Sequence, residues 1–171
     1  MWFYEKQLQY PVKIKNPNPK LASVIISQLG GPDGEMGASM RYLHQRYSCP
    51  YDKVTGILTD VGSEELGHME MVAQTINLLN GHDVNAGEVQ AGEIQTHVIL
   101  GLNPGLMNSS GYSWTADYVT VTGDLCADLL SNIASEQRAK VVYEYLYRQI
   151  EDKKVRETID FLLNREEAHN Q

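Results

Sequence analysis

Two pairs of side chains in this sequence have the types and spacing of metal ligands: Glu65 with His68, and Glu166 with His169. Residues three apart on a helix lie on one face, so each pair could offer a carboxylate oxygen and an imidazole nitrogen to one ion. Such a mixed donor set suits manganese, iron or zinc. A single Glu-x-x-His pair in an acidic helical protein is more often a solvated face, so the pattern around both pairs decides between the two interpretations.

Both pairs lie on the apolar stripe of the segment that carries them. Residues spaced alternately by three and four form the buried face of a bundle helix. That series is Val54, Leu58, Val61, Glu65, His68 and Val72 in one segment, and Val155, Ile159, Leu162, Glu166 and His169 in the other. Glu64 and Glu70 lie off the stripe, and we expect both to face water. The stripe therefore predicts that both Glu-x-x-His pairs point into the core.

Two further segments each place a lone glutamate on the inward face. Glu35 continues a face that begins at Leu21, and Glu136 follows Ile133. An isolated buried carboxylate is costly unless it is paired, protonated or bound to a metal. Four converging glutamates would repel one another, and a pair of divalent cations relieves that repulsion. A lone Glu from two helices and Glu-x-x-His from two others is the ligand pattern of di-iron and di-manganese bundles, so the sequence predicts a dinuclear metal site.

Four helical segments must position these side chains. We expect helices over residues of about 19–47, 52–80, 124–150 and 153–170. Asn18-Pro19 is a start signal, because Asn caps a helix and Pro fits its first turn. Asn80-Gly81 is a stop signal. Within the first segment, "GGPDG" at 30–34 favours a break, which leaves either one kinked helix or two shorter helices.

Residues 81–122 form the longest stretch without a helical pattern. A structureless loop of that length is unusual within a compact domain. Its aromatic and apolar residues favour an ordered crossover, or an arm to a neighbouring subunit, over disorder. With this crossover between the second and third helices, we expect residues 1–171 to form one domain, an all-α, ferritin-like four-helix bundle.

Composition excludes several classes of protein. Fourteen Lys and Arg against 22 Asp and Glu give a formal charge of −8, and no basic cluster is present, which argues against a nucleic-acid partner. No apolar run is long enough to cross a bilayer, and the N-terminus lacks the apolar stretch of a secretory signal. Cys49 and Cys126 are too few for a disulfide framework. We therefore expect a cytoplasmic protein in a reducing compartment, with no membrane partner.

Several stretches also resemble one protein family. They are "GGPDGEMGASMRYLHQRY", "LTDVGSEELGHMEMVAQTI", "GDLCADLLSNIASEQRAKVVYEYL" and "FLLNREEAHNQ". All four are similar to the non-haem manganese catalases, and most of all to the branch that includes the spore-coat protein of the CotJC type. The similarity covers nearly the whole chain. The helical motifs are specific, and the loop region is less so.

Carried over residue by residue, the resemblance implies two manganese ions, with iron as the alternative metal. The implied ligands are Glu35, Glu65, His68, Glu136 and His169. Glu65 would bridge both ions. Glu35 and His68 would complete one site, and Glu136 and His169 the other.

The resemblance also implies supporting roles. In the general di-iron pattern Glu166 is a ligand, whereas the matching residue of manganese catalases is an outer carboxylate hydrogen-bonded near the site, and we follow the family. Tyr42 matches a tyrosine that supports the first-helix glutamate. Some family members have a basic residue at the positions of Ser135 or Tyr143, and Lys140 is the candidate replacement here. The family also implies that the first helix continues through 30–34.

The implied activity is the disproportionation of hydrogen peroxide to water and oxygen, with Glu65 and Glu166 in catalytic roles. The implied partners are further copies of the chain, in a hexamer, and other spore-coat proteins, which adds the spore coat to the cytoplasm as a location. Two alternatives stay open. One is a structural spore-coat component with a metal site and little catalysis. The other is a di-iron ferroxidase or oxidase, which requires Glu166 as a ligand.

Overall fold

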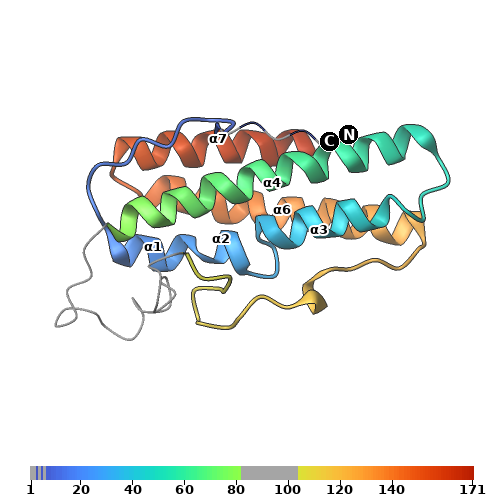
Figure 1. Ribbon diagram of the computed structural model, residues 1–171, viewed down its shortest axis with the longest axis horizontal. Coiled ribbons are helices and arrows are strands. Elements are labelled where there is room, and N and C mark those ends of the chain that lie inside the picture. The colour runs from blue at the N-terminus through green and yellow to red at the C-terminus, as the bar shows by residue number, and fades with distance from the viewer. Residues whose placement is uncertain (1–2, 4, 6, 82–103) are drawn as a thin grey trace.

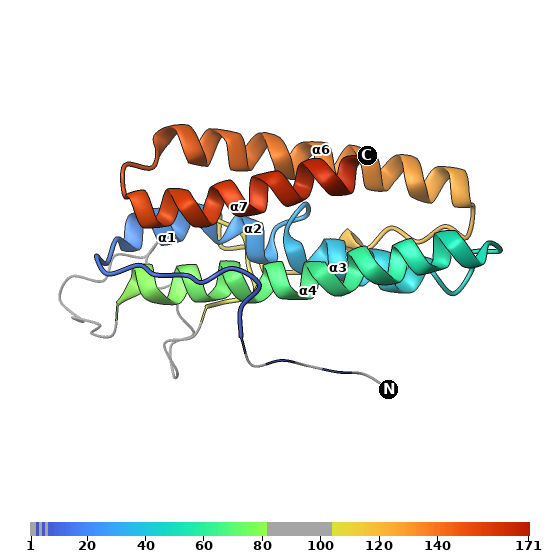
Figure 2. The same ribbon diagram turned by 90° about the horizontal axis from the view of Figure 1, so that it is seen from above.

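The computed structural model describes residues 3, 5, 7–81 and 104–171. Its helices are α1 (Pro19–Ile25), α2 (Ser27–Gly30), α3 (Glu35–Gln45), α4 (Asp52–Asn80), η1 (Ala116–Tyr118), α6 (Leu125–Gln149) and α7 (Lys153–Asn170). The long helices α4, α6 and α7 run side by side, and α1, α2 and α3 follow one another along the fourth edge (Figures 1 and 2). Because α3 packs on α4, α4 on α7, α7 on α6 and α6 on α3, the bundle closes around a single core.

Capping side chains open α1, η1, α6 and α7. Asn18 Oδ1 accepts a hydrogen bond from the Leu21 amide at 3.1 Å, and Asp152 Oδ1 accepts one from the Lys154 amide in the first turn of α7 at 2.8 Å. Such caps satisfy backbone donors that have no partner within the helix. Helix α4 ends where Gly81 adopts a φ of +76°, a conformation that glycine reaches without a steric penalty. These signals are readable in the sequence, and the bounds of α4, α6 and α7 lie within one residue of the expected ones.

The first helix is divided, and the prediction of a helix that continues from 19 to 47 through "GGPDG" is wrong. Helix α2 ends at Gly30, because Gly31 is extended (φ −79°, ψ 173°) and Pro32 has no amide hydrogen to donate. Gly34 is again extended and precedes the first residue of α3, which is Glu35. The break therefore places this glutamate at the start of a helix that faces α4 and α6.

The crossover between α4 and α6 is ordered where the structure describes it. Its residues 104–122 run along α2 and α3, and include a short antiparallel bridge between Met107 and Ser113 (Figure 1). The backbone approaches α2 so closely that a Cβ on Gly30 would lie 2.3 Å from the Met107 amide nitrogen. Gln45 Nε2 also donates to the Thr120 carbonyl at 3.0 Å. The remainder of the predicted crossover lies outside the described residues.

Two apolar clusters flank a polar middle in the bundle. The larger cluster includes Ile25, Leu29, Ile76, Ile159 and Leu162, and the smaller one consists of Ala38, Tyr42 and Leu58. The buried side chains between them are carboxylates, imidazoles and hydroxyls. No helix among the described residues is long and apolar enough to cross a membrane.

Candidate metal centre

Four helices deliver six donor side chains to the polar middle. They are Glu35 from α3, Glu65 and His68 from α4, Glu136 from α6, and Glu166 and His169 from α7. None of these side chains is more than about 4% exposed. The predicted inward face of each helix is therefore confirmed for all six residues.

Glu65 lies between the two histidines. Its Oε2 atom is 3.0 Å from His68 Nδ1, and its Oε1 atom is 2.7 Å from His169 Nδ1. The two imidazole rings stack with their centroids 5.5 Å apart. The Glu65 carboxylate thus places one oxygen beside Nδ1 of each imidazole, which is the arrangement that a bridging ligand needs.

The two lone glutamates divide equally between the histidines. Glu35 Oε2 is 3.8 Å from His68 Nδ1, and Glu136 Oε2 is 3.8 Å from His169 Nδ1. This pairing agrees with the division implied by the sequence, one half built on Glu35 and His68 and the other on Glu136 and His169. The residues are brought together by four different helices, so only the folded bundle creates the two halves.

Glu166 lies about as close to His68 as each lone glutamate lies to its histidine. Its Oε1 atom is 3.9 Å from His68 Nδ1. Glu65, His68, Glu166 and His169 each offer one donor atom to a group in which all the atoms lie within 4.8 Å of one another. The distances are compatible with Glu166 as a ligand and with Glu166 as an outer carboxylate, so its role remains a prediction that metal binding must decide.

Burial and mutual repulsion dominate the electrostatics of the cluster. Burial, followed by the negative charge of neighbouring glutamates, raises the pKa of Glu35, Glu136 and Glu166 above the ordinary range of a carboxyl. Contacts with the two histidines outweigh burial at Glu65 and lower its pKa. Contacts with glutamates raise the pKa of His68 to about 10 and that of His169 to about 9, although burial opposes the change.

The donor atoms fit a metal better than they fit one another. Glu65 Oε1, His169 Nδ1 and Glu166 Oε1 are buried and have no hydrogen-bond partner in the described part of the chain. The first two are only 2.7 Å apart, but they are not aligned for a hydrogen bond. Buried polar atoms without partners are rare in stable proteins. Oxygen and nitrogen donors that converge in this way suit divalent manganese or iron.

Two tyrosines hold the lone glutamates, and they do so across the bundle. The Tyr42 hydroxyl of α3 donates to Glu136 of α6, and the Tyr143 hydroxyl of α6 donates to Glu35 of α3. The prediction that Tyr42 supports the first-helix glutamate is therefore wrong in its partner. Tyr42 lies two turns after Glu35 on α3, and its side chain points across the bundle to α6. The sequence contains the signal, since each tyrosine follows a glutamate by seven residues.

Lys140 does not contact the cluster. Its ammonium forms an ion pair with Glu167 on the surface, so the predicted supporting role next to the site is not seen. A different cation lies nearby. The buried Arg41 guanidinium of α3 donates from Nη2 to Ser135 Oγ at 2.7 Å, immediately before Glu136 in the sequence. The sequence did not predict this contact of Arg41, because an apolar stripe shows which face of α3 is buried but not which residues of α6 that face meets.

Glu64 is the second residue whose position was predicted wrongly. Its side chain is 19% exposed, but the carboxylate does not simply face water. It accepts hydrogen bonds from Arg165 Nε at 2.7 Å and Gln9 Nε2 at 2.6 Å, and it contacts His169 Nε2 at 3.1 Å. The contacts with His169 and His68 hold the pKa of Glu64 well below its usual range. The spacing of four between Glu64 and His68 was the available signal.

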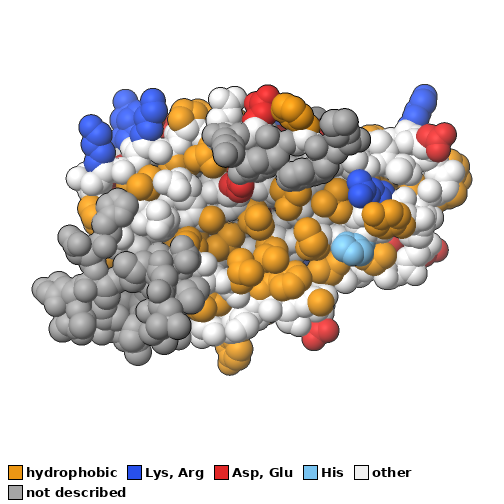
Figure 3. All heavy atoms as spheres, viewed as in Figure 1, with side chains coloured by type: hydrophobic (Ala, Val, Ile, Leu, Met, Phe, Trp, Pro, Cys, Tyr) orange, Lys and Arg blue, Asp and Glu red, His pale blue; other side chains and the backbone are white. Residues whose placement is uncertain are grey.

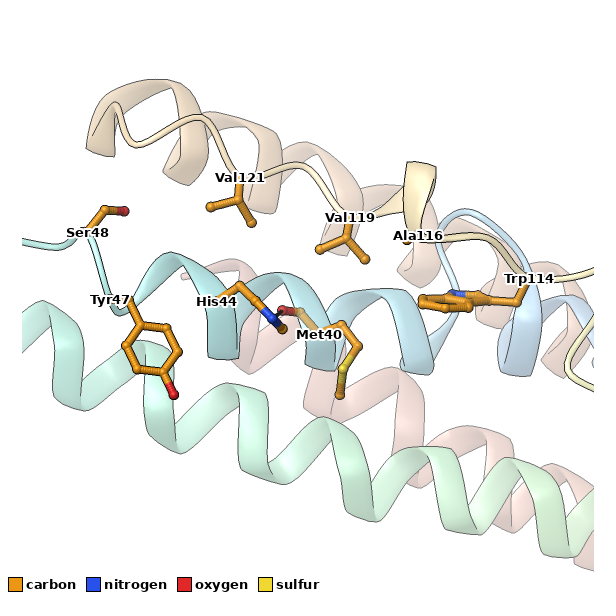
Figure 4. Close-up of a pocket in the computed structure, with 8 residues that line it drawn as sticks. All are labelled: Met40, His44, Tyr47, Ser48, Trp114, Ala116, Val119 and Val121. Atoms are coloured by element: carbon orange, nitrogen blue, oxygen red, sulfur yellow. Dashed lines mark hydrogen bonds between the residues drawn. The ribbon is translucent and has the colours of Figure 1, made fainter.

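An open groove lies apart from this cluster, between α3 and the crossover. It has a volume of about 650 Å³ and is lined by Met40, His44, Tyr47, Ser48, Trp114, Ala116, Val119 and Val121 (Figure 4). His44 Nδ1 contacts the Met40 carbonyl oxygen at 2.7 Å, so this histidine is satisfied within its own helix. None of the six donor residues lines the groove.

Comparison with known proteins decides the family. The sequence model described as "Manganese containing catalase" matches residues 1–171. This chain belongs to the manganese-containing catalase family. A "Probable manganese catalase" of Clostridium acetobutylicum is 60% identical over 172 aligned positions, which cover 99% of this chain and 76% of that protein. Protein CotJC of Bacillus subtilis is 41% identical, with 99% of this chain and 89% of CotJC covered.

A solved manganese catalase has the same fold. The crystal structure of KatB, a manganese catalase from Anabaena, superimposes with a TM-score of 0.89 at 32% sequence identity, covering 100% of this chain and 77% of KatB. The predicted all-α, ferritin-like four-helix bundle and the predicted family are both confirmed. The similarity to CotJC also agrees with the branch of manganese catalases that the helical motifs indicated.

Proposed function

We propose that this chain is a dinuclear manganese catalase that converts two molecules of hydrogen peroxide into two of water and one of oxygen. The observation that carries the proposal is the position of Glu65, with one carboxylate oxygen 3.0 Å from His68 Nδ1 and the other 2.7 Å from His169 Nδ1. Membership of the manganese catalase family supports both the metal and the substrate.

We assign five residues to the two manganese ions. Glu65 holds both ions, Glu35 and His68 complete one site, and Glu136 and His169 complete the other. When bound, the two ions supply or accept the two electrons that each peroxide exchanges, by changing oxidation state by one unit each. A carboxylate-rich set of donors suits this chemistry, because anionic oxygen stabilises the higher oxidation state.

The protein must also handle protons. Oxidation of one peroxide to oxygen releases two protons, and reduction of the next to two waters consumes two. Glu166 suits this exchange, because burial and the surrounding carboxylates raise its pKa and so favour the protonated carboxyl. Its Oε1 atom makes no hydrogen bond within the described residues and is free to receive or release that proton. Tyr42 and Tyr143 hold Glu136 and Glu35 in place during the exchange.

A di-iron oxidase remains the second candidate, because Glu166 belongs to the group of converging donors. Metal analysis of protein expressed with both metals available, beside a peroxide-to-oxygen assay, separates the two. We expect about two manganese ions per chain and rapid oxygen evolution. Iron in place of manganese, without oxygen evolution, would support the oxidase. Full manganese with no oxygen would support the structural spore-coat alternative.

The matched variants for that assay lie on one helix. Glu65→Ala removes the proposed bridge and is expected to abolish both manganese binding and oxygen evolution. Asp60→Ala removes the same charge from an exposed position of α4 and is expected to leave both unchanged. Unchanged manganese content in Glu65→Ala would refute the site.

We also propose that the chain forms a homo-oligomer, a hexamer by family resemblance. Support comes from its exposed apolar side chains, among them Tyr47, Tyr51, Ile57, Leu130 and Tyr145, and from the hydrophobic side chains that gather on the face shown in Figure 3. Light scattering on the purified protein gives the copy number, and a monomer at micromolar concentration would refute it. The similarity to CotJC supports the spore coat as a location beside the cytoplasm, which fractionation of spores can test.

A further inference from the structure

Each histidine of the candidate centre lies between two neighbouring carboxylates of α4. The Nδ1 atoms face Glu65, at 3.0 Å for His68 and 2.7 Å for His169. The Nε2 atoms face Glu64: that of His169 is 3.1 Å from it, in a hydrogen bond, and that of His68 is 3.5 Å from it, without one. Adjacent glutamates on one helix therefore contact opposite edges of the same two rings.

The two carboxylates can serve the rings in different ways. An imidazole that binds a metal through one nitrogen carries its proton on the other. A carboxylate that accepts this proton fixes the tautomer and the orientation of the ring, and it makes the metal-binding nitrogen more basic. Glu64 stands where such an acceptor is needed for both rings.

Glu64 is itself held rigidly. Arg165 donates to both of its oxygens, from Nε at 2.7 Å and from Nη2 at 3.1 Å, and Gln9 of the N-terminal segment donates at 2.6 Å. Arg165 lies on α7, one turn before His169. The carboxylate is thus fixed by three elements, α4, α7 and the N-terminal segment, and cannot turn away from the rings without breaking these bonds.

The position of Glu64 separates the rings from solvent. Together with Gln9, Asp60, Ser63 and Gly67 it lines a surface hollow of about 430 Å³, while its carboxylate contacts histidine side chains that are no more than 3% exposed. A surface ion pair between Glu64 and Arg165 alone would explain the exposed side. It would not explain why both buried Nε2 atoms meet the same carboxylate.

We propose that Glu64 is the positioning residue for the metal-binding histidines, accepting the Nε2 proton of His169 and facing that of His68, and so presenting Nδ1 of each to the metals. This inference rests on the proposed dinuclear manganese site. It assigns a role to the glutamate that lies off the apolar stripe, beside the one proposed to bridge the metals. The effect should be larger at His169, whose Nε2 atom is closer.

Manganese affinity, measured by competition with a chelator, tests the proposal on four variants of the full chain. Glu64→Ala is expected to lower the affinity by about 10- to 100-fold, the range seen when such outer partners are removed. Glu64→Gln keeps an acceptor oxygen and should lose less. Arg165→Ala removes the ion pair that holds Glu64 but leaves the carboxylate beside both rings, so its loss of affinity should be smaller than that of Glu64→Ala. Asp60→Ala removes a neighbouring charge in the same hollow and should stay within about threefold of the parent protein.

A second readout distinguishes positioning from general damage to the fold. In the zinc-loaded protein, ¹⁵N NMR of the imidazoles should show both protons on Nε2, and Glu64→Ala should shift the Nε2 signals, that of His169 most. Circular dichroism and thermal unfolding identify any variant that fails to fold, in which case Glu64→Gln carries the test. Parent-like affinity and unchanged Nε2 signals in a folded Glu64 variant would overturn the inference, as would an equal loss in Arg165→Ala. Failure of the parent protein to bind manganese would instead refute the proposed function.

Discussion

The middle and the C-terminal half of α4 are buried to the same extent but are made of opposite kinds of side chain. Met71, Val72 and Ile76 face the larger apolar cluster, whereas Glu65 and His68, only a turn or two earlier, are fully buried among carboxylates and imidazoles. Each fully buried aliphatic side chain stabilises the fold by about 1.5–3 kcal/mol. The buried carboxylates have the opposite tendency, since burial disfavours their charged form. The C-terminal half of α4 therefore stabilises the bundle, whereas the buried side chains in its middle are stable only with protons, hydrogen bonds or metal.

The largest difference between the regions should appear when a histidine of the polar middle is removed. We expect His68→Ala to lose the ion on the Glu35 side and His169→Ala the ion on the Glu136 side, so each variant binds one manganese instead of two. Peroxide disproportionation should fall to background, because two electrons can no longer be exchanged by a pair. Manganese content by mass spectrometry and oxygen evolution check this. Two ions retained in either variant would break the proposed division into halves.

A substitution in the larger apolar cluster should change the stability of the fold rather than its metal content. Leu162→Ala, at a residue that is 1% exposed, is expected to lower the free energy of unfolding by about 2–5 kcal/mol through lost burial and a cavity. Manganese per folded chain should remain two, because Leu162 contacts the apolar cluster. Denaturant unfolding beside metal analysis tests both statements. Leu130→Ala, at an exposed position of α6, is the control with little expected effect. Loss of manganese at full foldedness in Leu162→Ala would show that the regions are not separable.

The crossed tyrosines predict a smaller effect that is specific to one half. Tyr143→Phe removes the hydrogen bond to Glu35, and Tyr42→Phe removes the one to Glu136. Hydrogen bonds to charged groups contribute about 1.5–3 kcal/mol, so each change should weaken one ion by roughly 10-fold or more. In the His169→Ala background, which retains the Glu35 side, only Tyr143→Phe should lower manganese affinity. In the His68→Ala background only Tyr42→Phe should. Equal losses from both tyrosines in one background would contradict the crossed arrangement.

The smallest expected effect is a pH dependence of stability in metal-free protein. The pKa values of His68 (about 10) and His169 (about 9) lie above the ordinary 6.5 of histidine. Their contribution to stability is therefore complete below pH 6.5 and is lost as the pH rises towards 9–10. The raised pKa values of Glu35, Glu136 and Glu166 act in the same direction. We expect the midpoint of thermal unfolding to fall between pH 6.5 and 9, and manganese to remove the fall by replacing the protons on Nδ1. A metal-free midpoint that rises over this range would contradict the charge states inferred here.

Periodicity and capping signals were sufficient for much of this description. Asn18-Pro19 and Asn80-Gly81 mark helix ends in the structure, and the spacing of apolar residues identified all six inward donors. These features are local, so a single helix contains the information. The break after Gly30 was also visible locally, but the family resemblance favoured a continuous helix, and the missing donor of Pro32 prevailed.

Contacts between helices were harder to predict. A stripe shows which face of a helix is buried but not which side chain of the neighbouring helix it meets, so the partner of Tyr42 was assigned to the wrong glutamate. Glu64 lies at the edge of the stripe, where its carboxylate reaches both water and the buried imidazole rings. Its place in the apolar spacing alone predicted a solvated side chain. Lys140 was chosen for its charge and its place in the sequence, whereas Arg41 of another helix lies beside Ser135.

Anomalous diffraction from crystals of the manganese-loaded protein, recorded on both sides of the manganese absorption edge, tests the central assignment most directly. We predict two manganese peaks on either side of the Glu65 carboxylate, one beside His68 Nδ1 and the other beside His169 Nδ1. The same map shows whether Glu166 contacts a metal. A single peak, peaks at the iron edge instead, or two manganese ions away from Glu65 would contradict the account.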